Sequence, residues 1–240
     1  MAGGQALTIR SLTTQEEFAE AVALQKTIWG FDDLDLLPVR LFVVASKIGG
    51  QVFGAYDDDR MVAFLLAIPG LKQGPQPYLH SHMLGVLPEY RNSGLGRSLK
   101  LHQREEALAR GIRLIEWTFD PLEIKNAWFN IARLGAIVRR YTRNQYGITS
   151  SALNAGLPTD RCVAEWWIQS PLRKTPVEEG IRLPIDIASI RTTDTDRARD
   201  IQTELANQFE AAFGRGLAVI GVERDDACFT YLLGCTEEPA

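Results

Sequence analysis

The chain is poor in cysteine and has no long apolar run, and these absences exclude several classes of protein. Its 240 residues include three cysteines, Cys162, Cys228 and Cys235, which are scattered and form no CxxC pair. That spacing argues against a disulfide framework and a cysteine-based zinc site, so we predict no metal. No segment approaches the roughly 20 consecutive apolar residues that a membrane-spanning helix needs. The sequence therefore predicts a protein with no membrane partner.

An excess of basic charge and a secretory signal are lacking as well. Lysine and arginine number 26 against 30 aspartate and glutamate residues, which gives a formal net charge of -4. This balance offers no electrostatic footprint for DNA or RNA, and we expect no nucleic-acid partner. The opening residues, MAGGQALTIRSLTTQ, have neither the basic nor the apolar region of a signal peptide. We therefore expect a cytoplasmic protein.

Strand and helix patterns alternate along the first half of the chain. Thr14 followed by Glu17 has the form of a capping box, which predicts a helix that runs to about Trp29. Two apolar β-rich runs, residues 51–56 and 61–68, are joined by three aspartates and predict an antiparallel hairpin. The further predicted elements are a strand over 8–12, a helix over 39–48, a strand over 78–86, a helix over 95–110 and a strand over 113–119.

The second half continues with less regular patterns. Asp120, as an N-cap with proline after it, predicts a helix that ends near Gly135. Further along, the patterns predict strands over 162–168, 183–190, 216–222 and 229–234 and a helix over about 194–213. The proline-rich stretch 170–180 is the best boundary candidate. We predict an α/β fold with a mixed, partly parallel sheet in residues 1–170, and an α+β extension in residues 171–240.

The segment Arg91–Arg97, RNSGLGR, carries the clearest chemical signal. It joins a strand that ends at Val86 to a helix, and Gly94 and Gly96 let its backbone approach a ligand closely. The N–H groups of a first helical turn have no intrahelical acceptors and favour an anion. A Walker loop needs GxxxxGK[ST], and a dinucleotide fingerprint needs glycine or alanine where this chain has Leu99. The loop is therefore predicted to be an anion cradle of another kind.

Read as RxxGxG, with VLPEY directly upstream, the loop resembles the acyl-CoA-binding motif of the GNAT superfamily of N-acetyltransferases. The resemblance covers about residues 8–170 and implies direct transfer of an acyl group, from acetyl-CoA or another acyl-CoA, to a primary amine. It implies that the strand end binds pantetheine and that the loop binds pyrophosphate. Asn126 and Asn130 could bind the cofactor or could equally bridge locally. The cofactor-binding residues so predicted are Leu84, Gly85, Val86, Arg91, Asn92, Ser93, Gly94, Leu95, Gly96, Arg97, Asn126 and Asn130.

A narrower resemblance concerns FDPLEIKNAWFNIARLGA, the LPTDR region and AEWW, which look like one poorly characterised bacterial branch of these proteins. Some members are associated with acylation, including succinylation, of amino acids. This implies an acetyl or succinyl donor and a small-molecule amine substrate, which could be an amino acid. Arg161 could clamp a substrate carboxylate, or it could form a turn salt bridge.

The catalytic groups are less clearly marked. Ile131 stands where many family members have the tyrosine that protonates the departing thiolate, so Tyr141, Tyr146 or solvent would have to replace it. His82 suits the base and shares a face with Leu84 if no bulge intervenes; a buried structural histidine is the alternative. Glu116, in the apolar strand LIEWTF, lies either at a solvent edge or in the cleft. The predicted catalytic residues are His82, Glu116 and Tyr141.

Two other hypotheses stay open at this stage. One is a non-catalytic sensor that binds acyl-CoA, which the missing tyrosine would allow. The other is an interaction protein in which the C-terminal extension occludes the acceptor cleft. The extension either covers the sheet or builds an interface, so a homodimer is one arrangement that the sequence allows.

Overall fold

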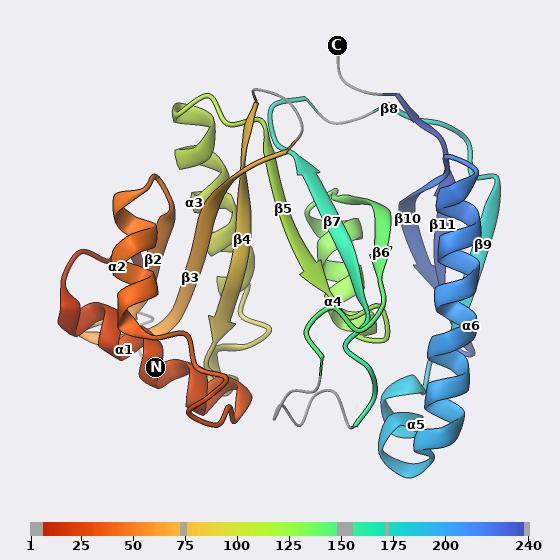
Figure 1. Ribbon diagram of the computed structural model, residues 1–240, viewed down its shortest axis with the longest axis horizontal. Helices are drawn as coiled ribbons and strands as arrows, with labels where there is room; N and C mark the ends of the chain where they lie inside the picture. Colours follow the sequence, from red (N-terminus) through yellow and green to blue (C-terminus); the bar gives the residue numbers. More distant parts are fainter. Residues whose placement is uncertain (1–6, 73–75, 148–155, 171–172, 238–240) are drawn as a thin grey trace, which may run out of the picture. The chain divides into compact units, whose positions relative to one another are not determined.

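The computed structural model describes residues 7–72, 76–147, 156–170 and 173–237 (Figure 1). The chain divides by its internal contacts into two compact units, Met1–Ile115 and Glu116–Ala240. The boundary lies inside one strand, β5 (Leu114–Phe119). The boundary predicted after residue 170 is a different one: it separates the predicted acyl-CoA-binding region from the C-terminal extension. It stays a prediction.

The first unit is built on antiparallel strands in the order β1-β2-β3-β4. Their bounds are β1 Thr8–Ser11, β2 Gln51–Asp57, β3 Arg60–Leu71 and β4 Pro77–Val86. The predicted hairpin is confirmed, since β2 and β3 pair antiparallel and Gly54 lies opposite Phe64. Both of these strands are buried along most of their length, as expected when helices cover both faces of a sheet.

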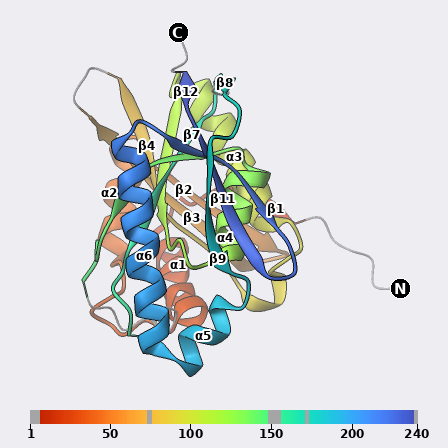
Figure 2. The ribbon, with the colours of Figure 1, turned by 90° about the vertical axis from the view of Figure 1, so that its right-hand side faces the viewer.

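Helices do cover both faces of this sheet. α1 (Gln15–Trp29) and α2 (Val39–Lys47) lie on one face, and α3 (Leu95–Ala109) lies on the other (Figures 1 and 2). The capping box is confirmed, because the Thr14 hydroxyl accepts a hydrogen bond from the N–H of Glu17 at 3.2 Å. In return, the Glu17 carboxylate accepts one from the N–H of Thr14 at 2.9 Å. The short 3-10 helix η1 (Pro88–Tyr90) leads from β4 towards α3.

β4 carries a β-bulge in its middle. Leu66 of β3 pairs with Met83, whereas the next residue, Ala67, pairs with Ser81, so His82 is an extra residue on β4. A bulge interrupts the ladder and breaks the alternation of side chains along the strand. The prediction that His82 shares a face with the end of the strand required an unbulged strand, and this condition is not met.

The second unit has the strand order β5-β7-β6-β10-β11-β9, and a separate small sheet pairs β8 with β12. The bounds are β6 Ile137–Thr142, β7 Arg161–Trp167, β8 Arg173–Lys174, β9 Glu179–Pro184, β10 Ala218–Arg224, β11 Cys228–Gly234 and β12 Thr236–Glu237. β7, β10 and β11 confirm predicted strands. β6 is absent from the predictions, because its buried Ile137 and Val138 are followed at once by two arginines.

Two predictions for this unit are wrong. Asp120 is not an N-cap: its Oδ1 accepts a hydrogen bond from the N–H of Leu122 at 2.8 Å, and α4 (Ile124–Trp128) begins later. The predicted strand over 183–190 ends at Pro184. The residues after it form α5 (Ile187–Thr193), because Ile187 and Ile190 are buried together at helical spacing.

The long C-terminal helix is confirmed as α6 (Thr195–Gly214), and the Asp194 side chain caps it by accepting a hydrogen bond from the N–H of Arg197 at 3.0 Å. α6 packs against β6 and β9 and runs along this sheet in Figure 2. The ring of Phe209 stacks on that of Tyr141, with 5.6 Å between their centres. This aromatic contact helps to hold the helix on the sheet.

Candidate functional site

The loop between β4 and α3 has the geometry of an anion cradle. Gly94, the N-cap of α3, has a φ of +89°, a left-handed conformation that favours glycine. The N–H of Ser98 bonds to the Gly94 carbonyl at 3.0 Å, so the N–H groups of residues 95–97 precede the first acceptor that α3 itself provides. A Cβ added at Gly94 would meet nothing within 4 Å. This start of α3 is therefore open to a ligand.

Side chains of the loop hold its backbone in place. Arg91 donates from Nε to the carbonyl of Val86 at 3.2 Å and from a terminal nitrogen to the carbonyl of Ile28 at 3.3 Å. The hydroxyl of Ser93 donates to the carbonyl of Tyr90 at 2.7 Å. These bonds tie the loop to the end of β4 and to the end of α1. The predicted cofactor residue Arg91 thus has a bracing role within the protein.

The end of β4 is tightly packed at Gly85, whereas the start of α3 leaves space for a side chain at Gly96. A Cβ added at Gly85 would come within 2.8–2.9 Å of three side chains, those of Ile28, Trp29 and Phe64. A Cβ added at Gly96 would lie 3.7 Å from the Leu84 side chain, an ordinary contact distance. The predicted residues Leu84 and Gly96 are therefore neighbours across the strand and the start of α3.

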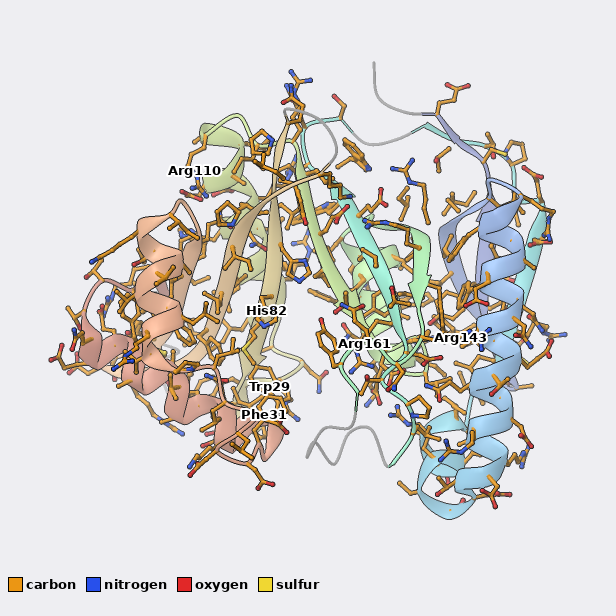
Figure 3. All side chains as sticks on the ribbon, in the orientation of Figure 1. Trp29, Phe31, His82, Arg110, Arg143 and Arg161 are labelled. Carbon is orange, nitrogen blue, oxygen red and sulfur yellow. The ribbon has the colours of Figure 1, made fainter. Side chains whose placement is uncertain are left out.

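His82 lies at the bulge and is half-buried. Burial lowers the pKa of its imidazole below the ordinary value of 6.5, so the ring is neutral at pH 7 and can accept a proton. Its ring centre lies 5.8 Å from that of His80. Figure 3 shows His82 on β4, with Trp29 and Phe31 close to the lower end of the same strand.

The second unit carries Asn126 and Asn130 on a segment that changes from α-helix to π-helix. α4 continues into η2 (Phe129–Arg133), where the N–H of Leu134 bonds to the carbonyl of Phe129 at 3.1 Å. Asn130 is buried and donates from Nδ2 to Oδ1 of the exposed Asn126 at 3.3 Å. The two asparagines thus bridge locally, and Asn126 is the one that solvent reaches. A π-turn is frequent at functional sites.

Glu116 is buried in an ion-pair cluster. Its carboxylate accepts a hydrogen bond from Arg140 at 2.6 Å, and Arg139 lies 2.6 Å from the carboxylate of Glu165. Arg140 also approaches Glu165 at 3.4 Å. The cluster gives Glu116 a structural function, and its predicted role as a base stays a prediction.

Tyr141 and Arg161 also have partners within the second unit. The Tyr141 hydroxyl donates to Asp160 at 2.7 Å; burial, followed by this bond, raises the pKa of Tyr141 well above its usual value, which makes it a weak acid. Arg161 donates to the carbonyl of Asp160 at 2.8 Å and lies over the ring of Tyr146, 5.6 Å from its centre. Tyr146 is exposed, and its hydroxyl lies 2.9 Å from that of Thr118.

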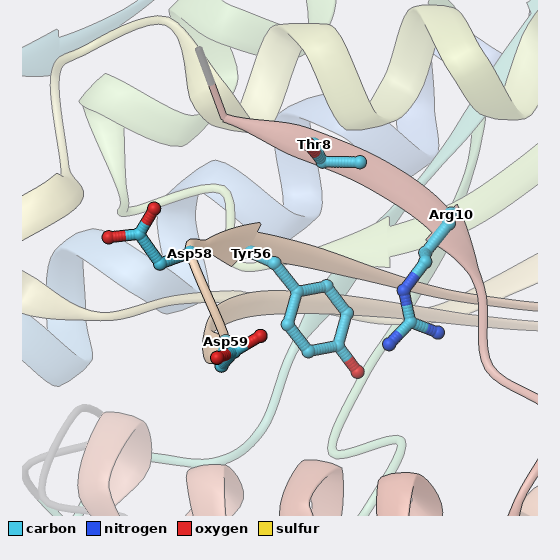
Figure 4. Close-up of a pocket in the computed structure, with 5 residues that line it drawn as sticks. All are labelled: Thr8, Arg10, Tyr56, Asp58 and Asp59. Atoms are coloured by element: carbon cyan, nitrogen blue, oxygen red, sulfur yellow. The ribbon is translucent and has the colours of Figure 1, made fainter. Parts of the chain in front are cut away.

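A separate pocket of about 190 Å³ lies at β1 and the turn of the hairpin (Figure 4). Its lining consists of Thr8, Arg10, Tyr56, Asp58 and Asp59. Arg10 lies over the ring of Tyr56, 4.2 Å from its centre, and also pairs with Glu17. The pocket shares no residue with the loop at α3, and none of its lining residues was predicted from the sequence.

Trp29, Ser81 and Lys100 are further residues that the sequence analysis does not single out, although all three contact β4 or belong to it. A signal was present for Lys100, since it follows Leu99 directly in a helix whose sheet-facing positions are otherwise apolar or amide.

Among the described residues, no group of three or more metal-binding side chains comes together. Nor does any helix in the described ranges combine the length and apolar character that crossing a bilayer requires.

Residues 16–128 match the model of the Acetyltransferase (GNAT) family. No curated protein sequence matches the chain. Among solved structures, the ribosomal-protein-S18-alanine N-acetyltransferase of Escherichia coli is similar with a TM-score of 0.54 and 20% identity, over 69% of this chain and 96% of that one. Arabidopsis thaliana NAA60 is similar with a TM-score of 0.55 and 12% identity, over 68% of this chain and 99% of that one.

A GNAT-family acetyltransferase from Streptococcus pneumoniae gives a TM-score of 0.52 and 18% identity, over 67% of this chain and 98% of that one. At these identities the neighbours establish the fold alone. The family match covers β2, β3, β4, the loop and α3. Residues 16–128 are therefore similar to the GNAT family, and the chain has the GNAT fold, a mixed and partly parallel sheet flanked by helices.

Proposed function

We propose that the protein is an N-acyltransferase that uses acetyl-CoA or another acyl-CoA as donor. The observation that carries the proposal is the open start of α3, where Gly94 adopts the left-handed conformation and the N–H groups of residues 96 and 97 precede the first acceptor within the helix. Those groups and the positive end of the helix dipole suit the pyrophosphate of coenzyme A. Two structural neighbours support this cofactor class, since NAA60 is described with acetyl-CoA and NatC with CoA.

The end of β4 supplies the second half of the cofactor site. Leu84, Gly85 and Val86 follow the bulge, where the strand departs from regular pairing, and their backbone suits the amides of the pantetheine arm. Acyl-CoA would supply the acyl group and a thiol leaving group. The chain's own contribution is then to bind and orient the donor and to accept a proton from the incoming ammonium.

His82 is the base that we favour. Its imidazole is neutral at pH 7 because burial lowers its pKa, and it lies on β4 only two residues before Leu84. Glu116 is the second candidate, but its carboxylate is already bonded to Arg140. For the general acid, Tyr141 is committed to Asp160, so the exposed Tyr146 or solvent is the better donor.

We propose a primary amine on a small molecule as the acceptor, and an amino acid acylated by an acetyl or succinyl group as the first class to test. Support comes from the resemblance to the bacterial branch and from Arg161, whose guanidinium could bind a carboxylate. One nitrogen of Arg161 is bonded to the carbonyl of Asp160.

The decisive experiment is thermal unfolding with acetyl-CoA, succinyl-CoA and free CoA. The Gly94→Glu variant places a carboxylate in the cradle. Gly111→Glu is the matched control, because Gly111 has a φ of +73° and a Cβ there would also meet nothing within 4 Å. A ligand at about 100 times its dissociation constant adds roughly 2.7 kcal/mol to the native state. We expect wild type and Gly111→Glu to shift and Gly94→Glu to stay unchanged; no shift in the wild type would refute the proposal.

A second candidate function is a sensor that binds acyl-CoA without turning it over. It is favoured by Ile131, which is buried at the position where many GNAT members have tyrosine. A thiol-release assay across amino acids and polyamines separates the two. The sensor would bind cofactor and release no thiol with any amine.

A further inference from the structure

A row of buried polar side chains lies between α3 and the sheet of the first unit. Gln51, Ser81, Lys100 and Gln103 are each less than 5% exposed. Burying such groups costs free energy unless every one of them is hydrogen-bonded, and apolar residues would pack there at lower cost. Their presence therefore requires a reason beyond filling space.

The strand register explains how the row forms. Gln51 of β2 pairs with Ala67 of β3, and Ala67 pairs with Ser81 of β4. Residues paired directly across a sheet project from the same face, so all three point towards α3. Because Ala67 is small, side chains from α3 can reach down between Gln51 and Ser81.

The hydrogen bonds in this row run in one direction. The Nζ of Lys100 donates to the Ser81 hydroxyl at 2.8 Å and to the Gln103 side-chain oxygen at 3.1 Å. The Gln103 amide donates to Gln51 at 2.9 Å, and the Gln51 amide donates to the Glu106 carboxylate. Each amide accepts through oxygen and donates through nitrogen, so the Lys100 donor at one end and the Glu106 carboxylate at the other fix both orientations.

The Ser81 end of the row meets the β-bulge. Ser81 is the last residue of β4 that pairs regularly before the extra residue His82. Lys100 lies on α3 four residues after Gly96, one helical turn from the start of the helix. The bond from Lys100 to Ser81 therefore links the helix that forms the cradle to the point where β4 changes register.

We propose that Lys100, through its bond to Ser81, is a positioning residue for acyl transfer. It holds the β4 bulge in register with the start of α3. Leu84–Val86 and the loop are thereby kept at the distance from each other that one bound coenzyme A molecule spans. The inference rests on the proposed function, because it concerns the same cofactor site. Burial lowers the pKa of Lys100 well below its usual range, and an uncharged amine would still donate both bonds.

The alternative is that the row contributes only to stability. Gln51 distinguishes the two, because it belongs to the same network but lies on β2, away from the bulge. If the row is only structural, changes at Gln51 and at Ser81 should have the same consequences. If Lys100 positions the bulge, only the Ser81 end should affect the cofactor.

The test uses Ser81→Ala, Ser81→Thr and the matched control Gln51→Met in the full chain. CoA affinity is measured by titration calorimetry, and amide hydrogen exchange is followed over residues 82–86. We expect Ser81→Ala to raise the Kd for CoA about tenfold, Ser81→Thr to restore it, and Gln51→Met to lower stability with the Kd unchanged. Exchange over residues 82–86 should rise selectively in Ser81→Ala.

An unchanged Kd in Ser81→Ala, or an equal rise in Gln51→Met, would overturn the inference. If the wild type binds no CoA, the proposed function fails, and the exchange experiment still decides this inference. In that case selective exchange over residues 82–86 in Ser81→Ala supports the positioning of the bulge, and uniform exchange overturns it.

Discussion

The indole of Trp29 lies so close to Gly85 that a Cβ on Gly85 would come within 2.9 Å of its ring. Ile28, the neighbour of Trp29 on α1, would meet the same Cβ at 2.8 Å. The end of α1 thus packs directly against the backbone that we propose to bind pantetheine. Changes in this contact should affect both folding and cofactor binding.

Gly85→Ala should therefore lower the free energy of unfolding by about 1–3 kcal/mol, the usual cost of overpacking, and weaken CoA binding. Gly96→Ala is the control for stability, because its Cβ would lie at an ordinary 3.7 Å from Leu84 in a helical turn. Urea unfolding of both variants checks the prediction. Equal stabilities for the two variants would contradict it.

Arg91→Lys should disturb the loop although it keeps the positive charge. Lysine cannot reproduce the two bonds that the guanidinium of Arg91 makes to the carbonyls of Val86 and Ile28. We expect hydrogen exchange over residues 91–97 to increase and CoA affinity to fall about as far as in Arg91→Met. Unchanged CoA affinity in Arg91→Lys would instead indicate that only the positive charge of Arg91 is needed.

The pH dependence of the reaction should report on His82. Because burial lowers its pKa below 6.5, the folded protein binds this proton less readily than the unfolded chain does. The contribution to stability is fully present above about pH 6.5 and is lost as the pH falls through the lower folded value. The acid limb of kcat/KM should lie below pH 6.5 for the same reason.

His82→Gln should remove that acid limb and lower the plateau by about 10²-fold, the usual contribution of a positioned base. A variant with the limb unchanged would exclude His82 as the base. Thermal midpoints measured over the same pH range separate loss of the base from loss of folded protein.

Arg140→Met should destabilise the protein more than Glu116→Gln does. The Glu116 side chain is 3% exposed and cannot regain water when its partner is removed, whereas Arg140 is 46% exposed and can. Removing the ion-pair partner of a buried carboxylate costs about 3 kcal/mol, and neutralising the carboxylate should cost about 1 kcal/mol. Chemical denaturation at pH 7 measures both, and the reverse order would show that the carboxylate is solvated in the native state.

Local features were the part of the fold that the sequence could predict. The Thr14 and Glu17 capping box and the glycine loop at α3 depend on residues within a few positions of one another, and both are present. β6 escaped prediction because only Ile137 and Val138 carry a strand pattern before the arginines begin. Its place is fixed by pairing with β7, which starts some 20 residues later.

The geometry of the candidate site divides in the same way between local and long-range features. The cradle is contained in seven consecutive residues, whereas the bulge at His82 exists only because β4 pairs with β3 out of step. The bond between Lys100 and Ser81 likewise depends on a row of residues across three strands. Asp120 shows that a local pattern can also mislead. Its carboxylate accepts the N–H of Leu122 in a tight turn, and the helix begins only after this turn.

The π-turn at η2 has a consequence for how this segment tolerates change in length. A π-turn holds one residue more than an α-turn, because the N–H of Leu134 reaches back five residues to Phe129. Deleting one residue between them would let an ordinary α-turn close, and the side chains after the deletion would keep their angular position relative to Asn126. A single-codon deletion in this stretch should therefore be tolerated more readily than one in a regular α-helix, where it turns every later side chain by about 100°.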